Sequence, residues 1–207
     1  LQFEVRCGRA VIHPDFVMGR DPHLVAEAIA RAKRQGVSEE LLSELDGFTG
    51  AVGIWDSGRP GPVTAFRFDI DCVQVGETSD PAHEANAGGY ASERPNLMHA
   101  CGHDGHLAVG LGVAQWIKDH ADQLCGKIKL VFQPAEEGTR GARPMAESGI
   151  LDDVDFIVCT HIGSSVPLHQ VAVCTHGYLA TTKLDIYFEG VPAHAGANPE
   201  KGRSALM

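Results

Sequence analysis

The stretch VTAFRFDID, Val63–Asp71, follows a proline and is typical of a buried β-strand that ends in two carboxylates. Two similar strands are predicted downstream, at KIKLVFQ (127–133) and DFIVCTHIG (155–163). Helical patterns separate them, at about 105–120 and 142–148. Strands that alternate with helices along the chain predict an α/β domain.

The remaining elements are predicted by capping residues, apolar alternation and turn residues. They are helices over 21–35 and 38–45, strands over 48–55, 171–177 and 181–190, a long polar loop over 76–96, and a Gly/Pro loop from 191 that enters a terminal helix.

The composition narrows the classes of function. The formal net charge of −10 argues against nucleic acid or an anionic membrane as a partner, because both require a basic surface. No apolar run approaches the length of a membrane span. Six cysteines scattered over 207 residues are typical of a reducing, cytoplasmic protein rather than a disulfide scaffold.

The segment MHACGHDGH, 98–106, gathers potential metal ligands in a glycine-containing loop. Cys101 and His103 are two residues apart and can face one ion if the loop is extended. His99 and His106 cannot both join them on the same face, and Asp104 can orient a ligand imidazole. The alternative is that these are structural residues at the entry to a helix.

Further polar residues follow the predicted strands. They are Asp69 and Asp71, the pair Glu136-Glu137, and His161. Because parallel strands of an α/β sheet collect their sites at their carboxyl ends, these side chains can converge in space. A carboxylate beside a metal-activated water can act as general base and then as general acid. The alternative for the glutamates is a solvated acidic pair.

Five motifs in this order resemble one known family. They are FRFDID (66–71), MHACGHDGH (98–106), FQPAEEGTRGA (132–142), THIG (160–163) and AHAGANPEKG (193–202). Together they resemble the dinuclear metallopeptidases that include aminoacylases and carboxypeptidase G. The cysteine in ACGHDGH resembles the motif of the amidohydrolase branch of this family. The GTRGA segment and the N-terminal helical insert most resemble those of the aminobenzoyl-glutamate hydrolases in that branch.

The resemblance implies two divalent ions, Mn²⁺ or Zn²⁺, with ligands and catalytic groups at matching positions. It implies that Cys101, His103, Glu137 and His161 are ligands, that Glu136 is the general base, that Asp69 orients a ligand histidine, and that His194 reaches a neighbouring subunit's site and stabilises the oxyanion.

The resemblance also implies a fold and a domain division. It implies a catalytic domain over residues 1–179, with a central mixed β-sheet flanked by helices, and the beginning of a smaller α+β lid or dimerisation domain over 180–207. Relatives carry a further ligand histidine nearer the C-terminus, which is absent here. The chain lacks an initiator Met and its last residues, SALM, have a helix-like pattern, so both ends look truncated in sequence. We expect little activity if these residues are the whole polypeptide.

The implied reaction is hydrolysis of an N-acyl amino acid, p-aminobenzoyl-glutamate in the first instance, by a homodimer or by a heterodimer with a related B subunit. This substrate is a dianion, and the cations considered for its carboxylates are Arg67, Arg140 and Arg143. Hippurate-like and acetyl-diaminopimelate substrates remain open. So do a non-catalytic partner subunit that retains the fold and a thiol protein centred on Cys101.

Overall fold

The computed structural model describes residues 2–163, 165–173, 181, 182, 184 and 186–206. The chain divides into two compact units, Leu1–Gln170 and Val171–Met207. Residues 174–180 include the predicted boundary between 1–179 and 180–207 and lie outside the described residues, so that boundary stays a prediction.

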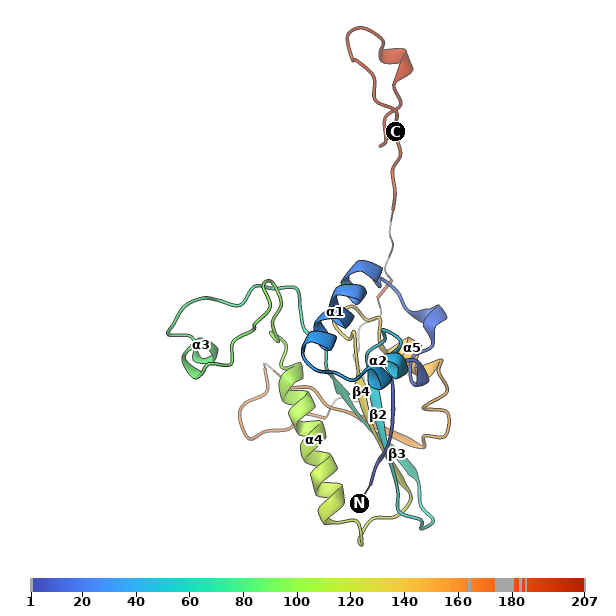
Figure 1. Ribbon diagram of the computed structural model, residues 1–207, viewed down its shortest axis with the longest axis vertical. Coiled ribbons are helices and arrows are strands. Elements are labelled where there is room, and N and C mark those ends of the chain that lie inside the picture. Colours follow the sequence, from blue (N-terminus) through green and yellow to red (C-terminus); the bar gives the residue numbers. More distant parts are fainter. Residues whose placement is uncertain (1, 164, 174–180, 183, 185, 207) are drawn as a thin grey trace. The chain divides into compact units, whose positions relative to one another are not determined.

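A mixed five-stranded sheet forms the centre of the first unit, in the order β1-β2-β4-β3-β5 (Figure 1). The strands β1 and β2 and the strands β2 and β4 are antiparallel, whereas β3 runs parallel to both β4 and β5. The bounds are β1 Glu4–Cys7, β2 Ala51–Asp56, β3 Val63–Asp69, β4 Lys127–Gln133 and β5 Phe156–Cys159.

The register aligns the carboxyl ends of the three parallel strands. Asp69 at the end of β3 pairs with Gln133 at the end of β4, and Arg67 pairs with Cys159 at the end of β5. The chain that follows each of these strands therefore leaves the sheet at the same edge. The predicted convergence of the strand ends is confirmed.

Five α-helices lie in the described part of the chain, and the two N-terminal ones begin at the predicted caps. The Asp21 carboxylate accepts from the His23 N–H at 2.8 Å, and the Ser38 hydroxyl accepts from the Leu41 N–H at 3.2 Å. The bounds are α1 Pro22–Arg34, α2 Glu39–Leu45, α3 Glu84–Gly88, α4 His103–Asp119 and α5 Ala142–Ala146. The predicted loop over 76–96 therefore contains one short helix, α3.

Helix α4 runs alongside the strands and covers one face of the sheet (Figure 1). Ile117 of α4 packs with Phe68 and Leu130, which are fully or almost fully buried. A Cβ added at Gly110 would lie 2.6 Å from the Phe132 ring and 2.9 Å from the Phe68 ring, so glycine permits a close approach of the helix to the sheet.

A second apolar cluster covers the opposite face of the sheet. Val52 of β2 and Val131 of β4 pack there against Val11 and against Met145 of α5. Successive residues of β2 and β4 point to opposite faces of the sheet and so contribute to both clusters, as expected for strands buried on both faces. Among the helices of the described residues, none combines the length and apolarity needed to cross a membrane.

The second unit differs from the sequence-based expectations. The predicted strand over 181–190 is wrong for its described residues, which form no strand, and 171–173 likewise form none. Residues 174–177 of the latter prediction lie outside the described residues. The predicted terminal helix is replaced by a 3₁₀ turn at Pro199–Lys201 and by a bridge between Val191 and Arg203. A strand pattern forms a strand only where a neighbouring backbone is available to pair with it.

Candidate metal centre

The potential ligands of the first unit come from the strand ends and from the start of α4. His103 is the first residue of α4, and Cys101 lies two residues before it. Between them, Gly102 adopts a left-handed conformation with φ of 82°, and a Cβ there would meet the Ile162 side chain at 3.3 Å. The glycine thus allows the chain to turn into α4 next to the segment that follows β5.

The His103 ring is buried, and its hydrogen bonds fix which nitrogen faces the site. Nδ1 lies 2.9 Å from the carbonyl oxygen of Asp71, which can only accept, so Nδ1 carries the proton. Nε2 is buried, and no described residue forms a hydrogen bond to it. It lies 3.9 Å from both Glu136 Oε2 and Glu137 Oε1. A buried acceptor nitrogen that faces two carboxylates is a group that a cation would satisfy.

Asp71 holds the two glutamates beside His103. Its carboxylate accepts the backbone N–H of Glu136 at 2.9 Å and that of Glu137 at 3.1 Å. Ala135, just before them, has φ of 54°, a conformation that non-glycine residues seldom adopt. Asp71 therefore organises the turn after β4 through its carboxylate, and it orients the His103 ring through its backbone carbonyl.

Cys101 and His161 bring a second pair of donors together. Cys101 Sγ lies 3.5 Å from His161 Nε2, and His161 Nδ1 donates to the carbonyl of Ile162 at 2.8 Å. The His161 proton is thus on Nδ1, and Nε2 is free to act as a ligand. Burial and the nearby negative charge of Glu137 raise the pKa of the Cys101 thiol. A divalent cation opposes the second effect and favours the thiolate.

These donors fit a transition-metal ion. Ligand atoms of Cys101, His103 and Glu137 all lie within 4.8 Å of one another. Thiolate, imidazole and carboxylate together are a ligand set that zinc and similar ions accept. A second group with the same spacing consists of Asp69, His103, His106 and His161. His103, whose Nε2 has no hydrogen-bond partner among the described residues, belongs to both groups, so this part of the chain fits the ions that the resemblance implies.

His106 is not available as a ligand, because both of its nitrogens are occupied. Nε2 accepts the backbone N–H of Ile162 at 2.7 Å, and Nδ1 donates to Asp69 Oδ1. Asp69 is expected to orient a ligand histidine, but its hydrogen-bonded histidine is His106, and His103 Nε2 lies 3.8 Å away. Burial opposes ionisation of Asp69, but the His106 hydrogen bond and the Arg67 charge outweigh it and lower the pKa of the carboxyl.

The three arginines considered for substrate carboxylates have different surroundings. Arg67 donates to Asp69 at 2.7 Å and to Gln133 at 2.8 Å. Arg143 is mostly exposed and its guanidinium lies 4.7 Å from the centre of the Phe16 ring. Arg140 Nε is buried, and no described residue forms a hydrogen bond to it. Arg140 therefore has an uncommitted donor within three residues of Glu137.

His194 lies in the second unit, in the loop that precedes the 3₁₀ turn. Its Nδ1 accepts backbone N–H groups from Gly196 at 3.2 Å and from Ala197 at 3.1 Å. The proton is therefore on Nε2, which points away from these two hydrogen bonds as a donor. The ring is exposed within its own unit.

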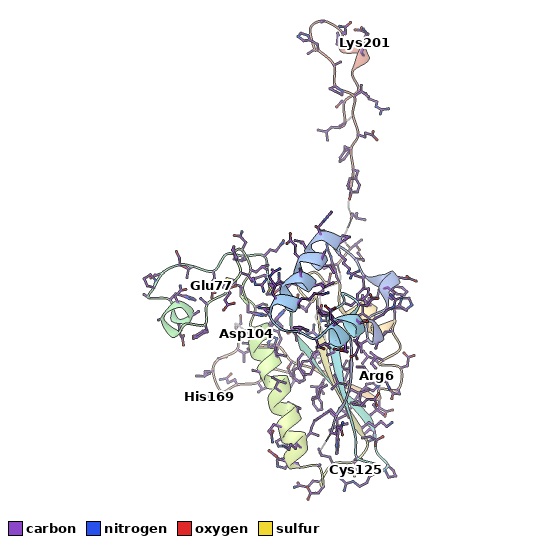
Figure 2. All side chains as sticks on the ribbon, viewed as in Figure 1. Arg6, Glu77, Asp104, Cys125, His169 and Lys201 are labelled. Atoms are coloured by element: carbon purple, nitrogen blue, oxygen red, sulfur yellow. The ribbon has the colours of Figure 1, made fainter. Side chains whose placement is uncertain are left out.

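Sequence reasoning missed the roles of Asp71 and His106. Both residues belong to recognisable motifs, Asp71 at the end of FRFDID and His106 at the end of CGHDGH. Asp104, expected to orient an imidazole, is instead exposed at the N-terminal end of α4 (Figure 2). The signal in the sequence is the second acid of FRFDID, but which acid orients which group depends on contacts between segments 32 or more residues apart.

A sequence profile of the peptidase family M20/M25/M40 matches residues 65–201, a range that contains all the donors just described. The chain belongs to this family. Over 205 residues, this M20 chain is 50% identical to a homolog of the A subunit of p-aminobenzoyl-glutamate hydrolase from Haemophilus influenzae, covering 99% of the chain and 48% of that relative. It is 49% identical to the indole-3-acetyl-aspartic acid hydrolase of Enterobacter agglomerans, covering 100% and 48%.

Solved structures agree with these relatives. The aminobenzoyl-glutamate utilization protein from Klebsiella pneumoniae superposes with a TM-score of 0.72 at 41% identity, over 99% of this chain and 46% of that one. The YXEP protein of Bacillus subtilis, a dinuclear metal-binding peptidase of the M20 family, gives 0.52 at 31%, over 68% and 37%. The predicted family and fold class are confirmed. The M20 chain spans about half the length of the curated relatives it matches.

Proposed function

We propose that the polypeptide carrying this chain is a metal-dependent amidohydrolase that cleaves p-aminobenzoyl-glutamate into p-aminobenzoate and glutamate. The observation that carries the proposal is the buried, unpaired Nε2 of His103, surrounded by the Cys101 thiol and the carboxylates of Glu136 and Glu137. Relatives at 50% and 49% identity are named for amides of glutamate and aspartate with an aromatic acyl group, which supports this substrate class.

The proposed ligands are Cys101, His103, Glu137 and His161, and the proposed cofactors are two ions of Mn²⁺ or Zn²⁺. When bound, such ions polarise the amide carbonyl and lower the pKa of a water molecule. His103 and His161 both donate their Nδ1 proton to a backbone carbonyl, so each presents an unprotonated Nε2 to the site. This is the tautomer that a ligand histidine requires.

Glu136 is the proposed general base. Its Oε2 lies 3.9 Å from His103 Nε2, and its backbone N–H is held by Asp71. The carboxylate therefore lies beside the ligand set without being needed for it. In this position it takes a proton from the attacking water and delivers it to the leaving amine.

His194 is the proposed oxyanion donor. Because its Nδ1 accepts from two backbone N–H groups, its Nε2–H is the part of the ring that can donate. A donor placed where negative charge develops lowers the barrier to amide hydrolysis. We assign this contact to a neighbouring subunit's site, as the family resemblance implies.

For the substrate carboxylates we propose Arg140. Its guanidinium has a buried donor with no partner among the described residues, whereas Arg67 is paired with Asp69 and Arg143 packs on the Phe16 ring. Because the chain has a net charge of −10, a local cation is needed to receive a dianionic substrate.

We further propose a dimer, either of identical chains or with a related B subunit. The Haemophilus influenzae relative is named as a homolog of the A subunit of a hydrolase, which supports the second arrangement. A cytoplasmic location is supported by the cysteines of the described residues, all five of which are free thiols.

The test measures bound metal and hydrolysis on the same preparations of the full polypeptide. Metal is measured by mass spectrometry, and release of amino acid from p-aminobenzoyl-glutamate, indole-3-acetyl-aspartate and hippurate by chromatography. We expect about two ions per chain and a preference for the glutamate conjugate. Preference for another conjugate would redirect the substrate assignment, and metal-free protein without turnover would favour the non-catalytic subunit.

Two variants assign the roles. Glu136→Gln is expected to retain its metal and to lose a factor of about 10² to 10⁴ in kcat, the contribution typical of a general base. Glu147→Gln is the matched control, because Glu147 is an exposed glutamate that pairs with Arg143. Equal activity of the two variants would contradict the assignment of Glu136.

A further inference from the structure

A line of buried polar groups starts in the sheet and leads toward the metal centre. Gln133 of β4 accepts from Arg67 Nε at 2.8 Å, and Arg67 Nη1 donates to Asp69 Oδ2 at 2.7 Å. The Asp69 side chain is fully buried. Both carboxylate oxygens are used, because Oδ1 accepts from His106.

His106 connects this line to the segment that follows β5. Its Nε2 accepts the Ile162 N–H at 2.7 Å, so Nε2 is unprotonated and the ring proton is on Nδ1, where it is donated to Asp69. The Asp69 carboxylate selects this tautomer because it can only accept. A ring with the opposite tautomer would turn a donor toward the Ile162 N–H.

The line ends at a proposed ligand. Ile162 follows His161 directly, and its carbonyl accepts the His161 Nδ1 proton at 2.8 Å. His161 is thereby left with a free Nε2, which lies 3.5 Å from Cys101 Sγ. The backbone of Ile162 is therefore held at its N–H by His106, while its carbonyl orients the His161 ring.

We propose that His106 is a positioning residue: with Asp69 and Arg67 it fixes the Ile162 backbone, which in turn fixes the tautomer and direction of the His161 ring. This rests on the proposed function only in taking His161 as a metal ligand. In this proposal Asp69 orients His106 and does not orient the ligand His103 directly. Loss of such an outer partner typically lowers metal affinity 10- to 100-fold.

The first measurement is long-range ¹H–¹⁵N correlation of the histidine rings in the metal-free protein, with a His161→Gln variant to assign the His161 signals. From their hydrogen bonds we expect both His106 and His161 to carry a proton on Nδ1 and none on Nε2. A His106 ring that is protonated on Nε2, or a His161 ring that interconverts between tautomers, would overturn the proposal. This result needs no folded variant at position 106.

Two substitutions at His106 separate its two hydrogen bonds. In His106→Gln the side-chain oxygen can replace Nε2 as acceptor for the Ile162 N–H, whereas in His106→Asn the amide reaches only Asp69. We expect Zn²⁺ affinity, measured by competition with a chromophoric chelator, to fall about tenfold or more in His106→Asn and less in His106→Gln. The His161 tautomer should become mixed only in the asparagine variant.

The control is His120→Gln at the opposite end of α4, where the histidine donates to the Trp116 carbonyl at 2.8 Å. It should leave Zn²⁺ affinity unchanged. Equal affinities in His106→Asn and wild type would refute the positioning role even if hydrolysis is observed. Conversely, the expected tautomers and affinities in a protein that hydrolyses none of the three conjugates would retain the positioning role and reject the proposed function.

Discussion

The closeness of α4 to the sheet can be tested with two glycines of the same helix. Gly110 is buried, and a Cβ there would lie 2.6 Å from the Phe132 ring and 2.9 Å from the Phe68 ring. Gly112 is exposed, and a Cβ there would meet nothing within 4 Å. The same change to alanine thus meets two aromatic rings at one position and solvent at the other.

The expected free energies follow from this difference. In either position alanine gains about 1 kcal/mol of helix propensity over glycine. At position 110 the added methyl overpacks the core, which costs about 1–3 kcal/mol. We therefore expect Gly112→Ala to be stabilised by about 1 kcal/mol, and Gly110→Ala to lie about 1–3 kcal/mol below it in free energy of unfolding.

Urea unfolding followed by circular dichroism measures both variants against wild type. A shift in the transition midpoint with an unchanged slope reports stability alone. Because α4 begins at His103 and carries His106, its displacement by the methyl at position 110 should also weaken Zn²⁺ binding by the Gly110→Ala variant. If Gly110→Ala were as stable as Gly112→Ala, the packing of α4 on the two aromatic rings would be refuted.

Three further predictions concern the metal centre and the charged core. In Asp71→Asn one of the two glutamate N–H groups should lose its acceptor, and Zn²⁺ affinity measured by calorimetry should fall about tenfold; unchanged affinity would contradict the organising role of this carboxylate. Hydrogen bonding to buried Lys129 holds the pKa of Asp153 below its usual value, so its contribution to stability is present above about pH 3.9 and is lost as the pH falls through the lowered pKa. Asp153→Asn should therefore destabilise the protein at neutral pH and reduce the loss of stability at acid pH. An unchanged loss of stability at acid pH would contradict the role of the Lys129–Asp153 pair. Metal at a hundredfold excess over its dissociation constant should add about 2.7 kcal/mol, or about 5–10 °C in Tm, relative to chelated protein; the difference should disappear in Cys101→Ala, and its persistence would remove the thiol from the site.

The elements that sequence predicts best are those specified by local signals. β4 has the predicted bounds Lys127–Gln133, and α2 begins after the Ser38 cap, because apolar alternation and capping act within a few residues. The segment 181–190 also alternates apolar and polar residues, but its described residues form no strand. Pairing is a property of two segments, and the sequence of one of them does not report whether the other is in place.

The metal centre shows the same division. Cys101 and His103 are recognisable in the sequence as candidate ligands because both lie in one short motif. The tasks of Asp71 and His106 are not recognisable there, because each depends on backbone groups of segments that are distant in sequence, such as the Ile162 N–H. Residue type suggests that an acid or a histidine takes part, and only the three-dimensional arrangement states what it contacts.

The distances along the chain between the partners of the metal centre bear on the order of events during folding. The contacts join residues 32, 60 and 65 positions apart, as in His103 with Asp71, Cys101 with His161, and Glu136 with Asp71. Closing such loops has an entropic cost that grows slowly with the number of residues in the loop. An unfolded chain therefore offers arriving cations only local pairs of donors, such as Cys101 with His103, and not the complete set. The donors come together only once β3, β4 and β5 have paired. Discrimination between metal ions therefore depends on the folded site rather than on the flexible chain.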